Sequence, residues 1–246
     1  MLGQILQLEA VDEYNNSGAL LGLDGENNEE IMGEILGALK KMNPLKRMRT
    51  VNKITAPPSA SKGSRAEMEK HFNELPPQIK EGLKKGELRL ADTVIYSVKP
   101  VTSKTIKLFE TQDDKEIGLR NISNAKLPKN QALLVSGIIL LCGVAADSSK
   151  DKMMSTKFDF IEDFPAIANG EFNLKSNKKQ IVPDTCNSVF KTKNFNFVTT
   201  GYYKLANPRL IEDDVLIELT IELGTMDGIA ANTVVWAGLH GTITTP

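Results

Sequence analysis

Histidine, cysteine and tryptophan, the side chains that most often carry metal, redox or ring-stacking chemistry, are scarce in this 246-residue sequence. It contains two histidines, His71 and His240, two cysteines and one tryptophan. A metal centre or an imidazole-activated nucleophile needs several such groups converging on one point. We therefore expect both histidines to be structural, and we expect no metal, no cofactor, no small-molecule substrate and no catalysis.

The two cysteines, Cys142 and Cys186, belong to no CxxC pair and have no histidine beside them. Two cysteines in a chain of this length do not make a disulfide framework. Unpaired cysteine is usually a core residue. The sequence therefore predicts two buried thiols in a reducing compartment.

Long hydrophobic runs are also missing. The longest run, residues 132–145, contains Ser136 and two glycines, and it is shorter than the roughly 20 residues that a membrane-spanning helix needs. Residues 1–14 lack a basic start and carry Glu9 and Asp12, so no secretory signal is predicted.

An excess of one charge is absent overall, because 30 Lys and Arg face 31 Asp and Glu, a formal net charge of −1. Although the total charge is nearly zero, two segments of the chain carry opposite net charges. Residues 1–34 contain eight acidic and no basic side chains, whereas residues 40–70 contain nine basic and two acidic ones. Blocks of like charge on terminal arms are often interaction segments.

The basic run KKMNPLKRMR, residues 40–49, is the strongest local electrostatic feature. Such a run can meet the phosphates of nucleic acid or of lipid headgroups, or the acidic segment of a neighbouring copy. The structural alternative is a solvated helix end followed by a linker. The candidate assembly, phosphate or lipid contacts are Lys40, Lys41, Lys46, Arg47 and Arg49.

The sequence changes character near residue 90, which predicts an N-terminal arm over residues 1–90 and a separate domain over residues 91–246. Within the arm, short helices are predicted over residues 27–42, from Ser64 with a capping box to Glu67, and from Pro77 to a stop at Gly86. Proline and small polar residues over 55–64 indicate a linker.

After residue 90 the sequence contains about eight strand candidates with turn-rich pieces between them. No long helical pattern interrupts them, so a parallel sheet is not expected. The predicted fold is mainly β, an antiparallel jelly-roll sandwich, with a compact double jelly roll as the alternative. The candidates are TVIYSVKPV, KTIKLFE, ALLVSGIILLCGVA, KFDFI, EFNLK with KQIVP, FNFVTTGYYKL, VLIELTIEL and TVVWAGLHGTIT.

In two of these strands hydrophobic residues recur at every second position, which predicts that each strand buries one face. In the last, Trp236 and His240 face away from the core, and Val235, Ala237, Leu239 and Ile243 face it. In the other, the predicted core side chains are Val215, Ile217, Leu219, Ile221 and Leu223.

The acidic residues Asp159, Glu162 and Asp163 could furnish a carboxylate pair or calcium ligands. They lack the Asx and Gly spacing of a calcium loop, and a solvated loop at a sheet edge is the favoured interpretation.

One resemblance bears on function. The segments KTIKLFETQDDKEIGLRNISNAKLPKNQALLVSGIILL, ANGEFNLKSNKKQIVPDTCNSVF and YYKLANPRLIEDDVLIELTIEL resemble jelly-roll capsid proteins of tailless icosahedral bacteriophages. The resemblance covers roughly residues 90–246 and implies a self-assembling virion protein made in the host cytoplasm. Its partners would be other copies, other virion proteins, and an internal membrane or packaged nucleic acid. Major capsid proteins of this kind commonly have two jelly rolls per chain, whereas this sequence has strands enough for one.

The alternative function is a β-sandwich binding module for carbohydrate or a receptor, of the fibre or adhesin type. Such a module needs clustered exposed aromatic rings, but only 6% of the residues are aromatic. Tyr202 and Tyr203 are adjacent, so they would face opposite sides of a strand. We therefore expect a capsid subunit.

Overall fold

A computed structural model describes residues 64–192 and 200–246. The chain divides into two compact units, residues 1–74 and 75–246. The sequence predicts a boundary at residue 90, next to Arg89, where the first strand starts. The helix predicted over residues 27–42 and the linker at 55–64 lie outside the described residues, except for Ser64.

Short helices are present at the two described places where the sequence predicts them. Helix α4 covers Ser64–Lys70 and is followed by the 3-10 turn η2, Phe72–Glu74. Helix α5 covers Pro77–Lys85, with proline in its first turn. Gly86 ends α5 with a φ of 78°, a left-handed conformation in which a glycine has no Cβ penalty.

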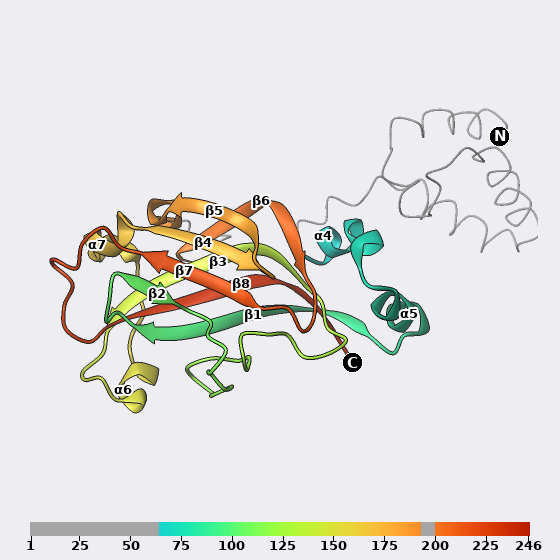
Figure 1. The fold of residues 1–246 in the computed structure, drawn as a ribbon, viewed down its shortest axis with the longest axis horizontal. Helices are drawn as coiled ribbons and strands as arrows, with labels where there is room; N and C mark the ends of the chain where they lie inside the picture. Colours follow the sequence, from blue (N-terminus) through green and yellow to red (C-terminus); the bar gives the residue numbers. More distant parts are fainter. Residues whose placement is uncertain (1–63, 193–199) are drawn as a thin grey trace, which may run out of the picture. The chain divides into compact units, whose positions relative to one another are not determined.

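The second unit is an antiparallel β-sandwich of two four-stranded sheets (Figure 1). One sheet has the order β1-β8-β3-β6 and the other the order β2-β7-β4-β5. The strands are β1 (Arg89–Pro100), β2 (Thr105–Lys107), β3 (Leu133–Val144), β4 (Glu171–Ser176), β5 (Lys179–Cys186), β6 (Tyr202–Ile211), β7 (Ile217–Glu222) and β8 (Thr233–Thr245).

The pairings are nested. Strand β4 pairs with β5, β3 with β6, β2 with β7 and β1 with β8, all antiparallel. These four pairings are those of one long hairpin whose centre is the turn between β4 and β5. Two further pairings, β3 with β8 and β4 with β7, join the hairpin into two sheets. The described residues thus form one sandwich.

Three strand predictions need correction. The segment KFDFI is not a strand, since only one isolated bridge joins Asp159 to Cys142, and the 3-10 turn η3, Ile161–Asp163, follows. Strand β2 is shorter than predicted. Strand β6 continues through Pro208 to Ile211, where a turn is predicted from the sequence. Further short helices are α6 (Lys150–Met154), α7 (Pro165–Ala168) and η4 (Asn187–Phe190).

The alternation predicted for β7 is confirmed. Ile217, Leu219 and Ile221 on β7 are at most 2% exposed, and Leu223 beyond it is 5% exposed. Val215 is partly buried against the same core. In β8 the predicted side chains Val235, Ala237 and Leu239 are fully buried, and Ile243 is partly buried against the same core. The burial of β8 does not alternate, however, because Val234, Thr242 and Thr244 at the other positions are at most 1% exposed. Both sheets therefore contribute to one core.

The prediction of two buried cysteines holds for one of them. Cys142, on the central strand β3, is fully buried, and burial raises the pKa of its thiol well above the usual value. Cys186 is exposed because it is the last residue of β5, which lies at the edge of its sheet and is bulged against β4. Hydrogen bonding with Ser188 lowers the pKa of the Cys186 thiol.

The edge strands of both sheets have features that disfavour pairing with a further strand. Strand β5 contains Pro183 and β6 contains Pro208, each on the outer strand of its sheet. Proline lacks the N–H that a neighbouring strand would need. The edge strand β2 has only three residues, which offers little ladder for another chain.

No helix among the described residues is both long enough and apolar enough to cross a membrane.

Candidate functional site

The basic side chains that the sequence singles out, Lys40, Lys41, Lys46, Arg47 and Arg49, lie outside the described residues. The candidate site that the structure describes lies in the sandwich unit.

The two histidines have separate structural partners. His71 Nδ1 lies 2.9 Å from Glu74 Oε1 at the end of α4. His240 on β8 is half-buried, its Nδ1 lies 3.2 Å from Ser136 Oγ, and its ring meets the ring of Tyr202 edge to face at 5.5 Å. Burial lowers the pKa of His240, and the charge of Asp92 opposes this change.

The acidic residues near α7 do not form a metal site. Asp159 Oδ1 accepts a hydrogen bond from the backbone N–H of Phe160 at 2.9 Å, and Asp163 ends the turn η3. Within residues 64–192 and 200–246, no three His, Cys, Asp or Glu side chains are placed to hold a metal ion.

The aromatic side chains pack against each other. Tyr203 meets the rings of Phe172 and Phe190 in the core, and Tyr202 faces the other side of β6 toward His240, as the sequence predicts. Trp236 stacks on Tyr96 with a ring separation of 5.8 Å and is partly buried.

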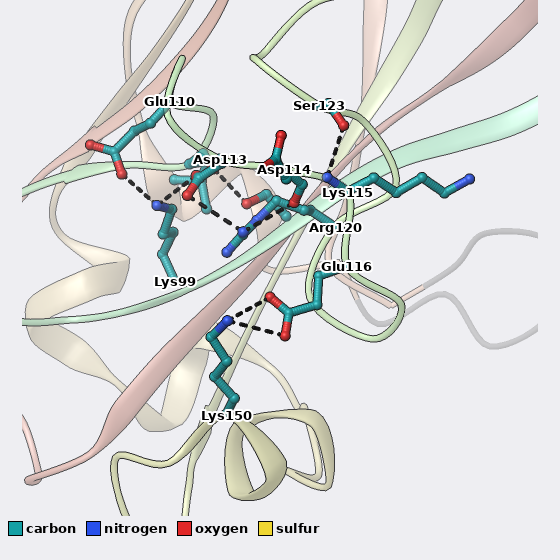
Figure 2. A network of polar contacts seen from close by, with 11 residues as sticks. Lys99, Glu110, Asp113, Asp114, Lys115, Glu116, Arg120, Ser123 and Lys150 are labelled. Atoms are coloured by element: carbon teal, nitrogen blue, oxygen red, sulfur yellow. Dashed lines mark hydrogen bonds and ion pairs between the residues drawn. The ribbon is translucent and has the colours of Figure 1, made fainter.

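The feature that sequence reasoning missed is a cluster of charges that holds the connection between β2 and β3 (Figure 2). The Nζ atom of Lys99, on β1, pairs with Glu110 and lies 2.7 Å from Asp113 Oδ2. The second contact is an ion pair without the alignment of a hydrogen bond. Asp113 Oδ1 lies 3.4 Å from Arg120 Nη1. The two positive and two negative charges balance one another.

This cluster is largely withdrawn from water. The side chains of Lys99, Asp113 and Arg120 are only 13–15% exposed. Charges at this depth are costly unless each has an opposite charge or a hydrogen bond. Arg120 also donates from Nη1 to the carbonyl oxygen of Asp114 at 3.3 Å. The connection is therefore fixed to β1 by contacts that break only at a substantial cost.

The same connection covers part of the free edge of β1. The backbone N–H of Tyr96 donates to Asn121 Oδ1 at 2.9 Å, and Asn121 Nδ2 donates to the carbonyl oxygen of Val94 at 2.8 Å. The backbone N–H of Val98 donates to the carbonyl oxygen of Leu119 at 2.8 Å. These contacts satisfy backbone groups that an edge strand leaves open.

Between Asp113 and Asn121 the connection turns sharply at residues 116–120. The backbone N–H of Arg120 donates to the carbonyl oxygen of Glu116 at 2.9 Å, and the reverse bond is 3.1 Å long. Gly118 has a φ of 91°, which a glycine adopts without strain. Ile117, beside it, is 86% exposed. The turn therefore presents an isoleucine to solvent on a fixed backbone.

A shallow groove, which we call the β2–β7 groove, lies over the outer side of β2 and β7. Leu216 and a small exposed part of Phe109 give it apolar surface. Lys107 gives it positive charge, and Glu110 and Glu218 give it negative charge. Its lining residues are Lys107, Phe109, Glu110, Thr111, Gln112, Leu216, Glu218 and Thr220. A groove with apolar and charged walls is suited to a side chain of another protein.

No protein-family model matches this chain, and no curated protein matches it.

Proposed function

We propose that this chain is a structural virion protein, a capsid subunit whose sandwich is a jelly roll and which assembles with other copies into an icosahedral shell. The single observation that carries the proposal is the strand order, β1-β8-β3-β6 against β2-β7-β4-β5. Nested pairing of eight strands across two sheets supports a jelly roll, an architecture used by viral capsid and lectin domains.

The proposal needs more than the fold, because jelly rolls serve several functions. Blunted sheet edges support it, since Pro183 and Pro208 disfavour uncontrolled pairing through β5 and β6. A subunit of a closed shell must associate through defined surfaces, because open-ended pairing makes fibres.

The segregated charges of the arm supply the second support. Eight acidic side chains over residues 1–34 and the basic segment after residue 40 can pair between copies. Each contact of this kind is weak, and a closed shell repeats it many times. The same basic residues would meet a membrane or nucleic acid enclosed by the shell.

The experiment is the mass of the native protein, by light scattering and analytical ultracentrifugation over a range of salt concentrations, with electron microscopy of the largest species. We expect closed particles or their capsomers, and we expect them to dissociate at high salt because exposed charges are screened. A monomer under all conditions would reject the proposal and favour a binding module.

A charge-reversal variant locates the electrostatic contact. Replacing Lys46, Arg47 and Arg49 by glutamate should block assembly and leave the thermal unfolding of the sandwich unchanged. The matched control replaces three exposed lysines of the sandwich unit, Lys84, Lys85 and Lys179, by glutamate. Equal effects of the two triple variants would show that only net charge matters and would reject a role for the basic segment.

A further inference from the structure

The most exposed large hydrophobic side chain within the described residues is Ile117, at 86%, followed by Val144 at 50% and Met154 at 36%. A single exposed apolar residue is ordinary on a protein surface. Ile117 differs because the backbone that carries it is fixed at several points.

The first fixed point is the turn itself. Glu116 and Arg120 exchange two backbone hydrogen bonds, and the backbone N–H of Gly118 donates to the hydroxyl oxygen of Tyr96 at 3.2 Å. Glu116 also makes an ion pair with a residue outside the turn, because Lys150 Nζ lies 2.8 Å from its Oε2 (Figure 2).

Close packing supports the turn from a second side. A Cβ placed on Gly118 would lie 3.1 Å from Cγ of Met154, so the backbone of the turn lies against that side chain. Arg120, at the end of the turn, pairs with Asp113, and Asp113 in turn pairs with Lys99 on β1. A side chain presented on so ordered a backbone loses little conformational entropy when it binds.

The β2–β7 groove has the properties required to receive this side chain. Leu216, which is partly buried, and the small exposed part of Phe109, 6% of its surface, offer apolar contact in the groove. Because Ile117 is 86% exposed, it does not occupy the groove of its own chain. An isoleucine from a second copy could be buried there without displacing any part of the first.

The charges beside the two surfaces are complementary. Asp114 and Lys115, both exposed, precede Ile117 on the connection. Lys107 and Glu218 line the groove. An acidic and a basic side chain on each partner allow two opposite-charge contacts around one apolar contact. Such pairs at an interface rim favour one register over others.

We infer that Ile117 of one copy inserts into the β2–β7 groove of the next copy. This inference rests on the proposed function and names one contact between capsid subunits. The two surfaces are different patches of the same chain, so the contact is heterologous, and repetition around an axis closes a ring. The subunits of such a ring belong either to one capsomer or to neighbouring capsomers.

Cross-linking tests the contact directly. In a Cys186→Ser background, Ile117→Cys and Thr220→Cys are made as two separate full-length proteins. Cys142 is buried and remains. Under mild oxidation, the mixture of the two proteins should give a covalent dimer that contains one of each. Neither protein alone should give a covalent dimer, because the inferred contact does not bring two copies of the same position together. A disulfide forms only when the two Cα atoms lie within about 7 Å of each other.

Two outcomes would overturn the inference. A dimer from Ile117→Cys alone would show that the turn meets its own copy across a two-fold axis. Oligomers that form without any cross-link between positions 117 and 220 would place the contact elsewhere while the proposed function stands. Cross-linked rings that never form shells would uphold the contact and reject the proposed function.

A charge substitution provides the second readout. Ile117→Asp should weaken association by about tenfold or more, since the buried area of one isoleucine is lost and a charge is desolvated. The matched control is Val144→Asp, at a half-exposed residue of β3. Thermal unfolding of both variants confirms that they are folded. Equal association of Ile117→Asp and the unchanged protein would overturn the inference.

Discussion

Asn121 Nδ2 donates a hydrogen bond to the carbonyl oxygen of Val94 over 2.8 Å, and in doing so a side chain takes the place of a neighbouring strand along β1. The Oδ1 atom of the same amide accepts from Tyr96 N–H. One residue therefore satisfies a donor and an acceptor that the edge of a sheet would otherwise expose.

Replacing Asn121 by alanine should lower the free energy of unfolding by about 1–3 kcal/mol, because two partly buried backbone groups lose their partner. Denaturant unfolding of the sandwich measures this loss. The control is Gln112→Ala, an exposed residue of the same connection, with an expected change within about 0.5 kcal/mol. Equal values for the two variants would show that water replaces the amide without cost.

Replacing Asp113 by alanine should cost about 1–3 kcal/mol of unfolding free energy, because it leaves the largely buried guanidinium of Arg120 without its carboxylate. The comparison is Lys150→Ala, which removes an ion pair whose lysine is 64% exposed. That change should cost less than about 1 kcal/mol. The reverse order of the two values would contradict a structural role for the buried cluster.

Replacing Leu219 by alanine should cost about 2–5 kcal/mol of unfolding free energy, because the side chain is 2% exposed in the core. Glu218, the preceding residue of β7, points to the other face, and Glu218→Ala should change the unfolding free energy little. A loss below about 0.5 kcal/mol for Leu219→Ala would mean that the register of β7 is wrong.

The stability of the sandwich should fall when the pH drops below the usual pKa of histidine, about 6.5. Burial lowers the pKa of His240 in the folded state, so the unfolded chain binds a proton at a higher pH than the folded one. This contribution to stability is present above about pH 6.5 and is lost as the pH falls toward the folded pKa.

Unfolding free energies between pH 5.5 and 7.5 for the unchanged protein and for His240→Asn measure this effect. The variant should show the weaker dependence on pH. His71 and the acidic residues are the same in both proteins, so they do not account for a difference. If the unfolding free energies of the two proteins depend on pH to the same extent, the predicted role of His240 is contradicted.

Much of the sandwich could be predicted because its signals are local. Alternation along β7 matches the side chains that its sheet buries. In β8 it does not, because Val234 and Thr242 are buried as well. KFDFI has the same alternating character, but its backbone meets β3 only at Cys142 and Asp159, and a strand needs a continuous partner. Pro208 suggests a turn, yet the outer strand of a sheet tolerates a residue without an N–H.

The charged connection could not be predicted from its residues. Glu110, Asp113 and Arg120 have the composition of a solvated turn, and their burial depends on Lys99 in another strand. The exposure of Ile117 could not be predicted from the sequence either, because an isolated isoleucine suggests a core position. The basic segment of the arm, in contrast, is evident from the sequence alone.

The nested pairing of the strands also ranks the pairings by the length of the loop that each one closes. The turn between β4 and β5 joins strands that are neighbours in sequence, so it closes a short loop at a small entropic cost. Each further pairing spans a longer loop, and β1 meets β8 across nearly the whole unit. Strand β8 is also central, with β1 on one side and β3 on the other.

The sheet that contains β1 therefore cannot close until residues 233–245 have been synthesised. Such long-range pairing is slow to form and leaves unpaired strand edges accessible in the meantime. Until β8 is present, β1 has no strand to pair with, and β3 lacks one of its two neighbours. The sheet is therefore completed only when β8 inserts between two strands that lie far apart in the sequence.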